Sequence, residues 1–285
     1  VLYQGNEFKK GSPIAPKLYR NLGGTFVKDT LEFKDNFINV STIKSVDLNN
    51  DGFLDLCFLS NAVPQEFGHT PKQWIFLNNG KGQFSEATTS IAPALEKLGN
   101  CNDALWIDLD NDGFQEGILA GDWMPLTLLK HNGTQLTPTT VEGFENSEGW
   151  WNVIKAADFD NDGDIDIVAG NWGLNTRLKA SPEEPISLYK ADFDNNQSEE
   201  TIITYFHKGK ETTLASKEEL VKQMPFLNKK YLSFKDFAKA SITDLFSEEK
   251  LKNSLQKKVV ELQSCYFENL GDLKFKKRPL PFSAQ

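Results

Sequence analysis

The sequence predicts an all-β protein built as a β-propeller of four-stranded blades. Three observations support this prediction. A nine-residue acidic loop recurs four times, and an apolar, strand-like segment follows each copy. A tight turn with Asn between apolar residues also recurs four times. The chain of 285 residues contains 21 Phe and 6 Trp but only 2 Met, and aromatic residues favour strands.

The acidic loops begin at residues 47, 108, 158 and 192 and read DLNNDGFLD, DLDNDGFQE, DFDNDGDID and DFDNNQSEE. Each loop has an oxygen-bearing side chain at positions 1, 3, 5 and 9, and the first three loops have Gly at position 6. Like charges held this close repel each other. A bound cation would turn that repulsion into binding energy.

This spacing predicts a calcium site in each loop. Ca²⁺ is a hard cation that takes about 6–8 oxygen ligands. Side chains at positions 1, 3, 5 and 9 and the backbone carbonyl at position 7 can surround one ion, and Gly at position 6 permits the positive φ of a sharp turn. The expected ligands are Asp47, Asn49, Asp51, Phe53 and Asp55; Asp108, Asp110, Asp112, Phe114 and Glu116; Asp158, Asp160, Asp162, Asp164 and Asp166; and Asp192, Asp194, Asn196, Ser198 and Glu200.

Two other interpretations of the loops compete with this one. An EF-hand requires Glu at position 12 and flanking helices, but position 12 is Phe58, Leu119 and Ala169 in the first three loops. Solvated acidic turns are the simpler alternative. The fourth loop should bind most weakly, because Gln197 replaces Gly and a left-handed non-Gly residue costs about 1 kcal/mol. We therefore expect three to four bound calcium ions.

The Asn-containing turns lie at 18–26, 76–84, 129–136 and 267–275. Asn and Gly between apolar residues are typical of a β-hairpin. Each repeat is then a strand, an acidic loop, a strand, a variable loop, a strand, an Asn-Gly hairpin and a last strand, as in a propeller blade. The expected blades cover approximately 1–36 (partial), 37–95, 96–145, 146–190 and 186–285.

Residues 207–264 do not follow this pattern and predict a helical insertion in the last blade. Ser216 and Glu219 form a capping box at the start of one helix. Leu251, Leu255, Val259 and Leu262 have helical spacing, and a third helix is expected around 234–238. We expect the 267–275 hairpin to complete the blade after the insertion. The insertion either packs on the propeller as a structural cap or docks a partner.

Composition and missing motifs exclude several classes of function. The net charge of −9 argues against nucleic acid and anionic membranes as partners. No apolar run approaches the roughly 20 residues of a membrane span. Cys57, Cys101 and Cys265 have no metal-binding or disulfide spacing and are expected as buried free thiols. No catalytic motif is present, and calcium accounts for the clustered carboxylates, so we do not expect an enzyme.

The loops resemble the FG-GAP/VCBS repeats of integrin-α-like β-propellers. The stretches GNEFKKGSP, NDALWIDLDNDG, GDWMPLTLL, GWWNVIKAADFDNDGDIDIVAGNWGLNTRLKAS and FENLGDLKF are similar to the large VCBS-repeat proteins of Bacteroidetes, often described with ASPIC/UnbV-type domains. The resemblance covers essentially the whole chain and implies a propeller of about seven blades. The chain would supply about four to five of them, so we expect the native protein to be longer.

A ligand is expected on the face opposite the calcium loops, where the second and third strands of each blade are joined. These loops cover 5–16, 60–73, 121–125 and 170–185, and variable loops on a rigid scaffold often bind ligands. The alternative is that the tryptophans of GDW and GNW only pack the blades. One ring of Trp150 and Trp151 is expected in the core. The candidate ligand-binding residues are Trp123, Asn171, Trp172, Asn175 and Arg177.

Taken together, the sequence predicts a calcium-stabilised extracellular β-propeller. We expect a protein-interaction or scaffold module at the bacterial cell surface, facing outward from the outer membrane, for example as an accessory of an uptake or secretion complex. Millimolar extracellular calcium would suit such loops. Two alternatives stay open: a carbohydrate-binding propeller that recognises a glycan, and a fragment of a polysaccharide-degrading enzyme.

Overall fold

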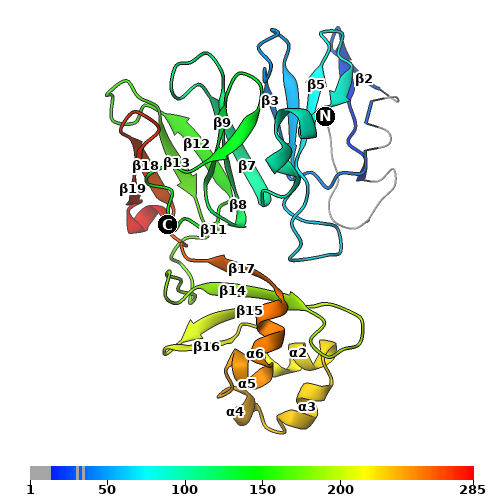
Figure 1. The fold of residues 1–285 in the computed structure, drawn as a ribbon, viewed down its shortest axis with the longest axis vertical. Helices are drawn as coiled ribbons and strands as arrows, with labels where there is room; N and C mark the ends of the chain where they lie inside the picture. The colour runs from blue at the N-terminus through cyan, green and yellow to red at the C-terminus, as the bar shows by residue number, and fades with distance from the viewer. Residues whose placement is uncertain (1–13, 30–31, 34–35) are drawn as a thin grey trace.

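A computed structural model describes residues 14–29, 32–33 and 36–285. The fold is mostly β, with several antiparallel sheets. Three of these sheets stand side by side, and a fourth sheet with a group of short helices lies below them (Figure 1). Most of the loop expected at 5–16, and part of the partial blade expected at 1–36, lie outside the described residues.

Two of the sheets are formed by strands that follow one another in sequence. A short hairpin precedes them, formed by β1 (Tyr19–Leu22) and β2 (Thr25–Lys28). The first sheet is β3 (Thr42–Val46), β4 (Asp55–Leu59), β5 (Trp74–Asn78) and β6 (Phe84–Glu86). The second is β7 (Asn100–Ile107), β8 (Glu116–Met124), β9 (Thr127–His131) and β10 (Leu136–Thr139), with β11 (Gly149–Trp150) also paired to β8. Between them lie α1 (Thr88–Ile91) and the 3-10 turn Pro93–Glu96.

The third sheet corrects the predicted course of the chain. It consists of β12 (Val153–Ala157), β13 (Asp166–Gly170), β18 (Cys265–Asn269) and β19 (Phe275–Pro279), and the 3-10 turn Phe282–Ala284 follows. The expectation that the 267–275 hairpin completes the blade of the fourth acidic loop was wrong. That hairpin pairs with β13 of the third loop, with Ile167 opposite Phe267. The physical reason is burial, because Phe267 and Phe275 share one core with Ile154 and Ile167.

The segment between β13 and β18 forms its own sheet and helices. The sheet has the order β16-β15-β14-β17, from β14 (Ile186–Ala191), β15 (Glu200–His207), β16 (Lys210–Thr213) and β17 (Leu255–Val259). The helices are α2 (Lys217–Gln223), α3 (Phe226–Lys230), α4 (Phe234–Phe237), α5 (Ile242–Leu245) and α6 (Glu248–Asn253). The fourth acidic loop joins β14 to β15, so this loop belongs to the inserted segment rather than to a separate blade.

The capping box of Ser216 and Glu219 is confirmed at the start of α2. The helix expected to run through Leu255, Val259 and Leu262 was wrong. The helix α6 stops before Ser254, and Leu255 to Val259 form β17, which pairs with β14. Residues four apart share a face in a strand as well as in a helix, so the spacing of Leu255 and Val259 suited both structures.

The hydrophobic cores lie between neighbouring sheets. One core joins the β3–β6 sheet to the β7–β10 sheet through Leu59, Ile75 and Leu119. The next core joins that second sheet to the third sheet, which consists of β12, β13, β18 and β19. It includes the fully buried ring of Trp151. Stacking each sheet on the next is the packing of propeller blades. Among the described residues, no helix has the length and apolar character needed to span a membrane.

Candidate functional site

The four acidic loops have nearly the same backbone path. In each loop the carboxylate at position 1 accepts the backbone N–H of position 6. The N···O distances are 2.8, 3.0, 3.2 and 2.9 Å for the donors Gly52, Gly113, Gly163 and Gln197, respectively. The side chain at position 5 accepts the N–H of position 7 at 2.7–2.9 Å. The chain therefore wraps around its own oxygen atoms in all four copies.

Two positions in each loop adopt a left-handed conformation. Position 6 has φ of 86°, 89° and 100° in the three loops with Gly, and 70° at Gln197. Position 4 is Asn in every loop, and Asn50, Asn111, Asn161 and Asn195 have φ between 55° and 63°. This second left-handed position was not among the features predicted for the loop. The signal was available, since the same Asn stands in all four copies and Asn tolerates this conformation well.

The acid at position 9 is buried and ties each loop to its sheet. Asp55, Glu116 and Asp166 have no exposed surface, and Glu200 is 5% exposed. Each of them accepts the backbone N–H of position 2 at 2.9–3.1 Å. Charge-assisted bonds of this kind hold the carboxylates in one orientation.

In two blades the same acid also reaches the Asn turn of the next hairpin. Asp55 accepts the N–H of Asn78, and Asp166 accepts the N–H of Asn269, both at 2.8 Å. Tyr266 donates its hydroxyl to Asp166 as well, at 2.8 Å. The acidic loops and the Asn turns therefore lie together at one end of each sheet.

Three of the loops gather carboxylates closely enough to share one cation. In each of the three, one oxygen from each of three side chains lies within 4.8 Å of the others. The groups are Asp108, Asp110 and Glu116; Asp158, Asp160 and Asp166; and Asp192, Asp194 and Glu200. The first loop has Asn49 at position 3, and this amide donates to Asp51 at 2.9 Å. Ligation through the position-5 side chains and the position-7 carbonyls stays a prediction.

Glu116 shows the strongest sign of a missing partner. One oxygen, Oε2, accepts the N–H of Leu109 at 3.0 Å, while Oε1 is buried and makes no hydrogen bond with the described residues. Burial raises the pKa of Glu116, although the nearby backbone N–H of His131 favours the charged form without completing a bond. The ammonium of Lys130 forms an ion pair with Asp110 of the same cluster. An uncompensated buried carboxylate oxygen is costly, and a cation would remove that cost.

Burial also raises the pKa of the acids at position 9 in the first and fourth loops, Asp55 and Glu200. The acids at positions 1 and 5 of the first loop and at positions 1 and 3 of the fourth raise these two pKa values further. Oxygen-only donor sets with several carboxylates suit hard divalent cations rather than soft metals. The residues present therefore fit a metal ion in these loops.

A second candidate site is a pocket of about 390 Å³ between the blades and the inserted segment, which we call the tryptophan pocket. Its lining includes Phe67, Asp122, Trp123, Trp150, Asn152 and Trp172, together with aliphatic side chains of the inserted segment. The structure therefore places Trp123 and Trp172 in one pocket, and their predicted role in ligand binding stays a prediction. One ring of the adjacent pair Trp150 and Trp151 was expected in the core, and Trp151 is the buried one.

The other predicted ligand-binding residues lie elsewhere. Asn171 is 9% exposed, and its side chain accepts the N–H groups of Trp150 and Trp172 at 3.0 and 2.8 Å and donates to the carbonyl of Glu261. It therefore holds the backbone of two tryptophans. Asn175 and Arg177 are exposed and do not line the tryptophan pocket. A direct role of these three residues in binding stays a prediction.

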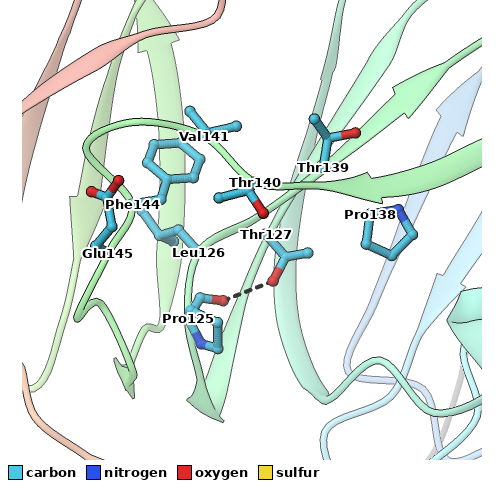
Figure 2. A pocket seen from close by; sticks show the side chains of 9 residues that line it. All are labelled: Pro125, Leu126, Thr127, Pro138, Thr139, Thr140, Val141, Phe144 and Glu145. Atoms are coloured by element: carbon cyan, nitrogen blue, oxygen red, sulfur yellow. Dashed lines mark hydrogen bonds between the residues drawn. The ribbon is translucent and has the colours of Figure 1, made fainter.

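A shallower hollow lies on the β9–β10 side of the second sheet (Figure 2). Pro125, Leu126, Pro138 and Val141 contribute much of its wall. Thr127 donates its hydroxyl to the carbonyl of Pro125 at 3.1 Å, and Thr139, Thr140 and Glu145 also line the hollow.

Residues 47–119 and 108–169 match the model of the FG-GAP-like repeat. The matched segments cover the first three acidic loops and the strands from β4 to β13. No curated protein shows a significant match to the chain. Residues 47–169 therefore contain repeats of the FG-GAP type, as their loops predicted. The narrower resemblance to proteins with ASPIC/UnbV-type domains stays a prediction.

Proposed function

We propose that this protein is a calcium-stabilised extracellular β-propeller that acts as a non-enzymatic interaction or scaffold module at the bacterial cell surface. One observation carries the proposal: the same cluster of carboxylate oxygens recurs in successive acidic loops. In one of them, a fully buried carboxylate oxygen of Glu116 lacks a hydrogen-bond partner among the described residues. Repetition at equivalent positions of the fold argues against chance clustering of surface acids.

Calcium fits these loops better than magnesium. Ca²⁺ accepts 6–8 oxygens in flexible geometry, whereas Mg²⁺ requires a near-octahedral shell and retains several waters. The loops offer up to four side chains and one carbonyl each, held on a curved backbone. Each bound ion would join the two strands that flank its loop. Through Asp55 and Asp166 the effect would extend to the Asn turns at 76–84 and 267–275.

The calcium requirement supports the proposed location, and the repeat family supports the proposed class of partner. Millimolar calcium outside the cell would fill weak sites that submicromolar cytosolic calcium would leave empty. FG-GAP repeats are typical of extracellular proteins and generally form interaction modules. We propose a protein partner at the outer membrane, such as an uptake or secretion complex for which this chain is an accessory.

Thermal unfolding in EDTA and in millimolar calcium tests the metal part of the proposal, with native mass spectrometry to count bound ions. We expect a higher Tm in calcium, three to four ions per chain, and a smaller effect of magnesium at equal concentration. An unchanged Tm together with no bound ion would mean that the loops are solvated turns.

Surface location needs a separate test. Protease treatment of intact cells should degrade the protein while it leaves cytosolic proteins intact, and crosslinking on intact cells should join it to outer-membrane proteins. Complete protection from the protease in intact cells, with degradation only after lysis, would refute surface exposure.

A further inference from the structure

The tryptophan pocket is built from parts of the chain that are distant in sequence. Asp122 and Trp123 lie near the end of β8, Trp150 lies on β11, and Trp172 follows β13. The inserted segment closes the other side with Ile203 and Leu214. The pocket therefore exists only where the insertion packs against the blades, as domain-interface binding sites often do.

The three indole rings of the pocket stand at steep angles to one another. Trp123 and Trp150 have ring centroids 5.1 Å apart and an interplanar angle of 84°. Trp150 and Trp172 have centroids 5.3 Å apart and an angle of 67°. Rings arranged in this way form a corner rather than a flat platform. The faces of the rings carry negative electrostatic potential, which attracts cations.

The polar groups of the pocket are few and partly occupied. Asp122 accepts a hydrogen bond from Asn102 at 3.0 Å, and Asn152 donates to the carbonyl of Trp150 at 3.3 Å. A sugar presents many hydroxyl groups, and each needs a partner when it is buried. Asp122 and Asn152, each already engaged in a hydrogen bond, offer few partners for them. The lining therefore favours a ligand with apolar substituents and a positive charge.

We propose that the tryptophan pocket binds a quaternary or N-methylated ammonium group, with Trp123, Trp150 and Trp172 around the cation and Asp122 beside it. Such a group has no N–H or O–H that would stay unpaired, and cation–π attraction is strongest with tryptophan. The inference rests on the proposed role as a binding module, but it does not depend on the calcium sites.

Lys257 is a competing positive charge near Asp122. Its ammonium bonds to Thr70 at 2.9 Å and also to Asn100, so its hydrogen-bonding groups are directed at these neutral side chains. Lys257 still weakens the field of Asp122. We therefore expect the indole rings to supply most of the affinity and the carboxylate to add to it.

The pocket is also held rigid before any ligand arrives. Asn171 fixes the backbone on both sides of the corner through its bonds to Trp150 and Trp172. Trp123 has φ of 61°, a conformation that is strained for a bulky residue and that persists only where the surroundings enforce it. A preformed site loses less free energy on binding than a mobile one.

The test compares choline with its neutral isostere 3,3-dimethylbutan-1-ol in calorimetric titrations at 1 mM calcium, with tryptophan fluorescence as a second signal. Choline should bind about tenfold more tightly than the neutral compound. Glycerophosphocholine and N-trimethyllysine then distinguish a lipid headgroup from a modified side chain as the source of the ammonium group.

Variants identify the residues responsible. Trp172 is 57% exposed, so Trp172→Ala should fold and weaken choline binding about tenfold, while Trp172→Phe should lose less. Asp122→Asn should weaken choline but leave the neutral isostere unchanged. The control is Phe234→Ala, which removes a 60% exposed ring from α4 and should change nothing. Circular dichroism checks that each variant is folded.

Equal affinity for choline and the neutral isostere would overturn the proposal, since the site would then be merely apolar. Binding of monosaccharides without binding of choline would also overturn it and would favour a glycan. Repeating the titration in EDTA separates the two proposals: choline binding that persists without calcium supports the pocket even if the loops prove to be metal-free.

Discussion

Replacing Asp160 by Asn should have opposite effects on stability with and without calcium. In the third loop, oxygens of Asp158, Asp160 and Asp166 lie within 4.8 Å of one another. Desolvation and the neighbouring carboxylates raise the pKa of the exposed Asp160, which shows that the fold disfavours its charge when no cation is bound. In EDTA the variant should therefore be as stable as the wild type or more stable.

In calcium the same variant should lose the contribution of one ion. At free calcium 100-fold above the dissociation constant, one occupied site adds about 2.7 kcal/mol to the free energy of unfolding, and three such sites add roughly 8 kcal/mol. Loss of one site should therefore remove about a third of the calcium-dependent stability. For a chain of this size, that corresponds to a decrease in Tm of roughly 4–6 °C.

The matched control is Asp164→Asn. It makes the same change in charge within the same loop, and both side chains are exposed, but Asp164 belongs to none of the clusters. Urea and thermal unfolding of both variants, in EDTA and in calcium, give the four comparisons. If Asp160→Asn keeps the full calcium response, or if both variants lose it equally, the proposed ligand set is wrong.

Three further predictions concern other parts of the molecule. Gln197→Gly should relieve the left-handed backbone of the fourth loop, raise the free energy of unfolding by up to about 1 kcal/mol and tighten calcium binding there, as urea titration and calorimetry can measure. The three thiols should react with Ellman's reagent only after unfolding, since all are buried and burial raises the pKa of Cys57 and Cys265 to about 12; fast reaction of the native protein would contradict the packing. Burial raises the pKa of Asp122 to about 6 from its ordinary 3.8, so the folded state holds a proton that the unfolded state releases between these values. Stability should thus fall as pH rises from about 4 to 6, and an Asp122→Asn variant with the same slope would refute this assignment.

The inserted segment changes how the repeat should be understood. Its β14–β15 pair carries an acidic loop with the same internal hydrogen bonds as the blade loops. Its sheet nevertheless adds β17 beside β14, on the edge that the corresponding strand β3 leaves unpaired in the first sheet. Lys250 of α6 donates to the carbonyls of Asp192 and Phe193, so a helix rests directly on this loop. Calcium bound there would stabilise the insertion and, through it, one wall of the tryptophan pocket.

The acidic loops could be located and assigned from sequence alone, because all their determinants lie within nine residues. The side chains at positions 1, 3, 5 and 9 and the residue at position 6 determine the local backbone, and the fold only has to supply a strand on each side. The Asn at position 4 is also determined locally, by its left-handed backbone, and could have been predicted with the other positions. The capping box at Ser216 was predictable for the same reason.

Strand partners and the tryptophan pocket could be decided only by the tertiary structure. The 267–275 hairpin has the same local pattern whichever sheet it joins, and the burial of Phe267 and Phe275 against Ile154 and Ile167 selects β13. Likewise, the local sequence from Leu255 to Val259 is compatible with a helix or a strand, and pairing with β14 selects the strand. The pocket joins residues of β8, β11 and the insertion, which meet only because of these long-range contacts. Local chemistry thus determined where acidic side chains gather closely enough to hold an ion, whereas non-local burial determined where the tryptophans meet.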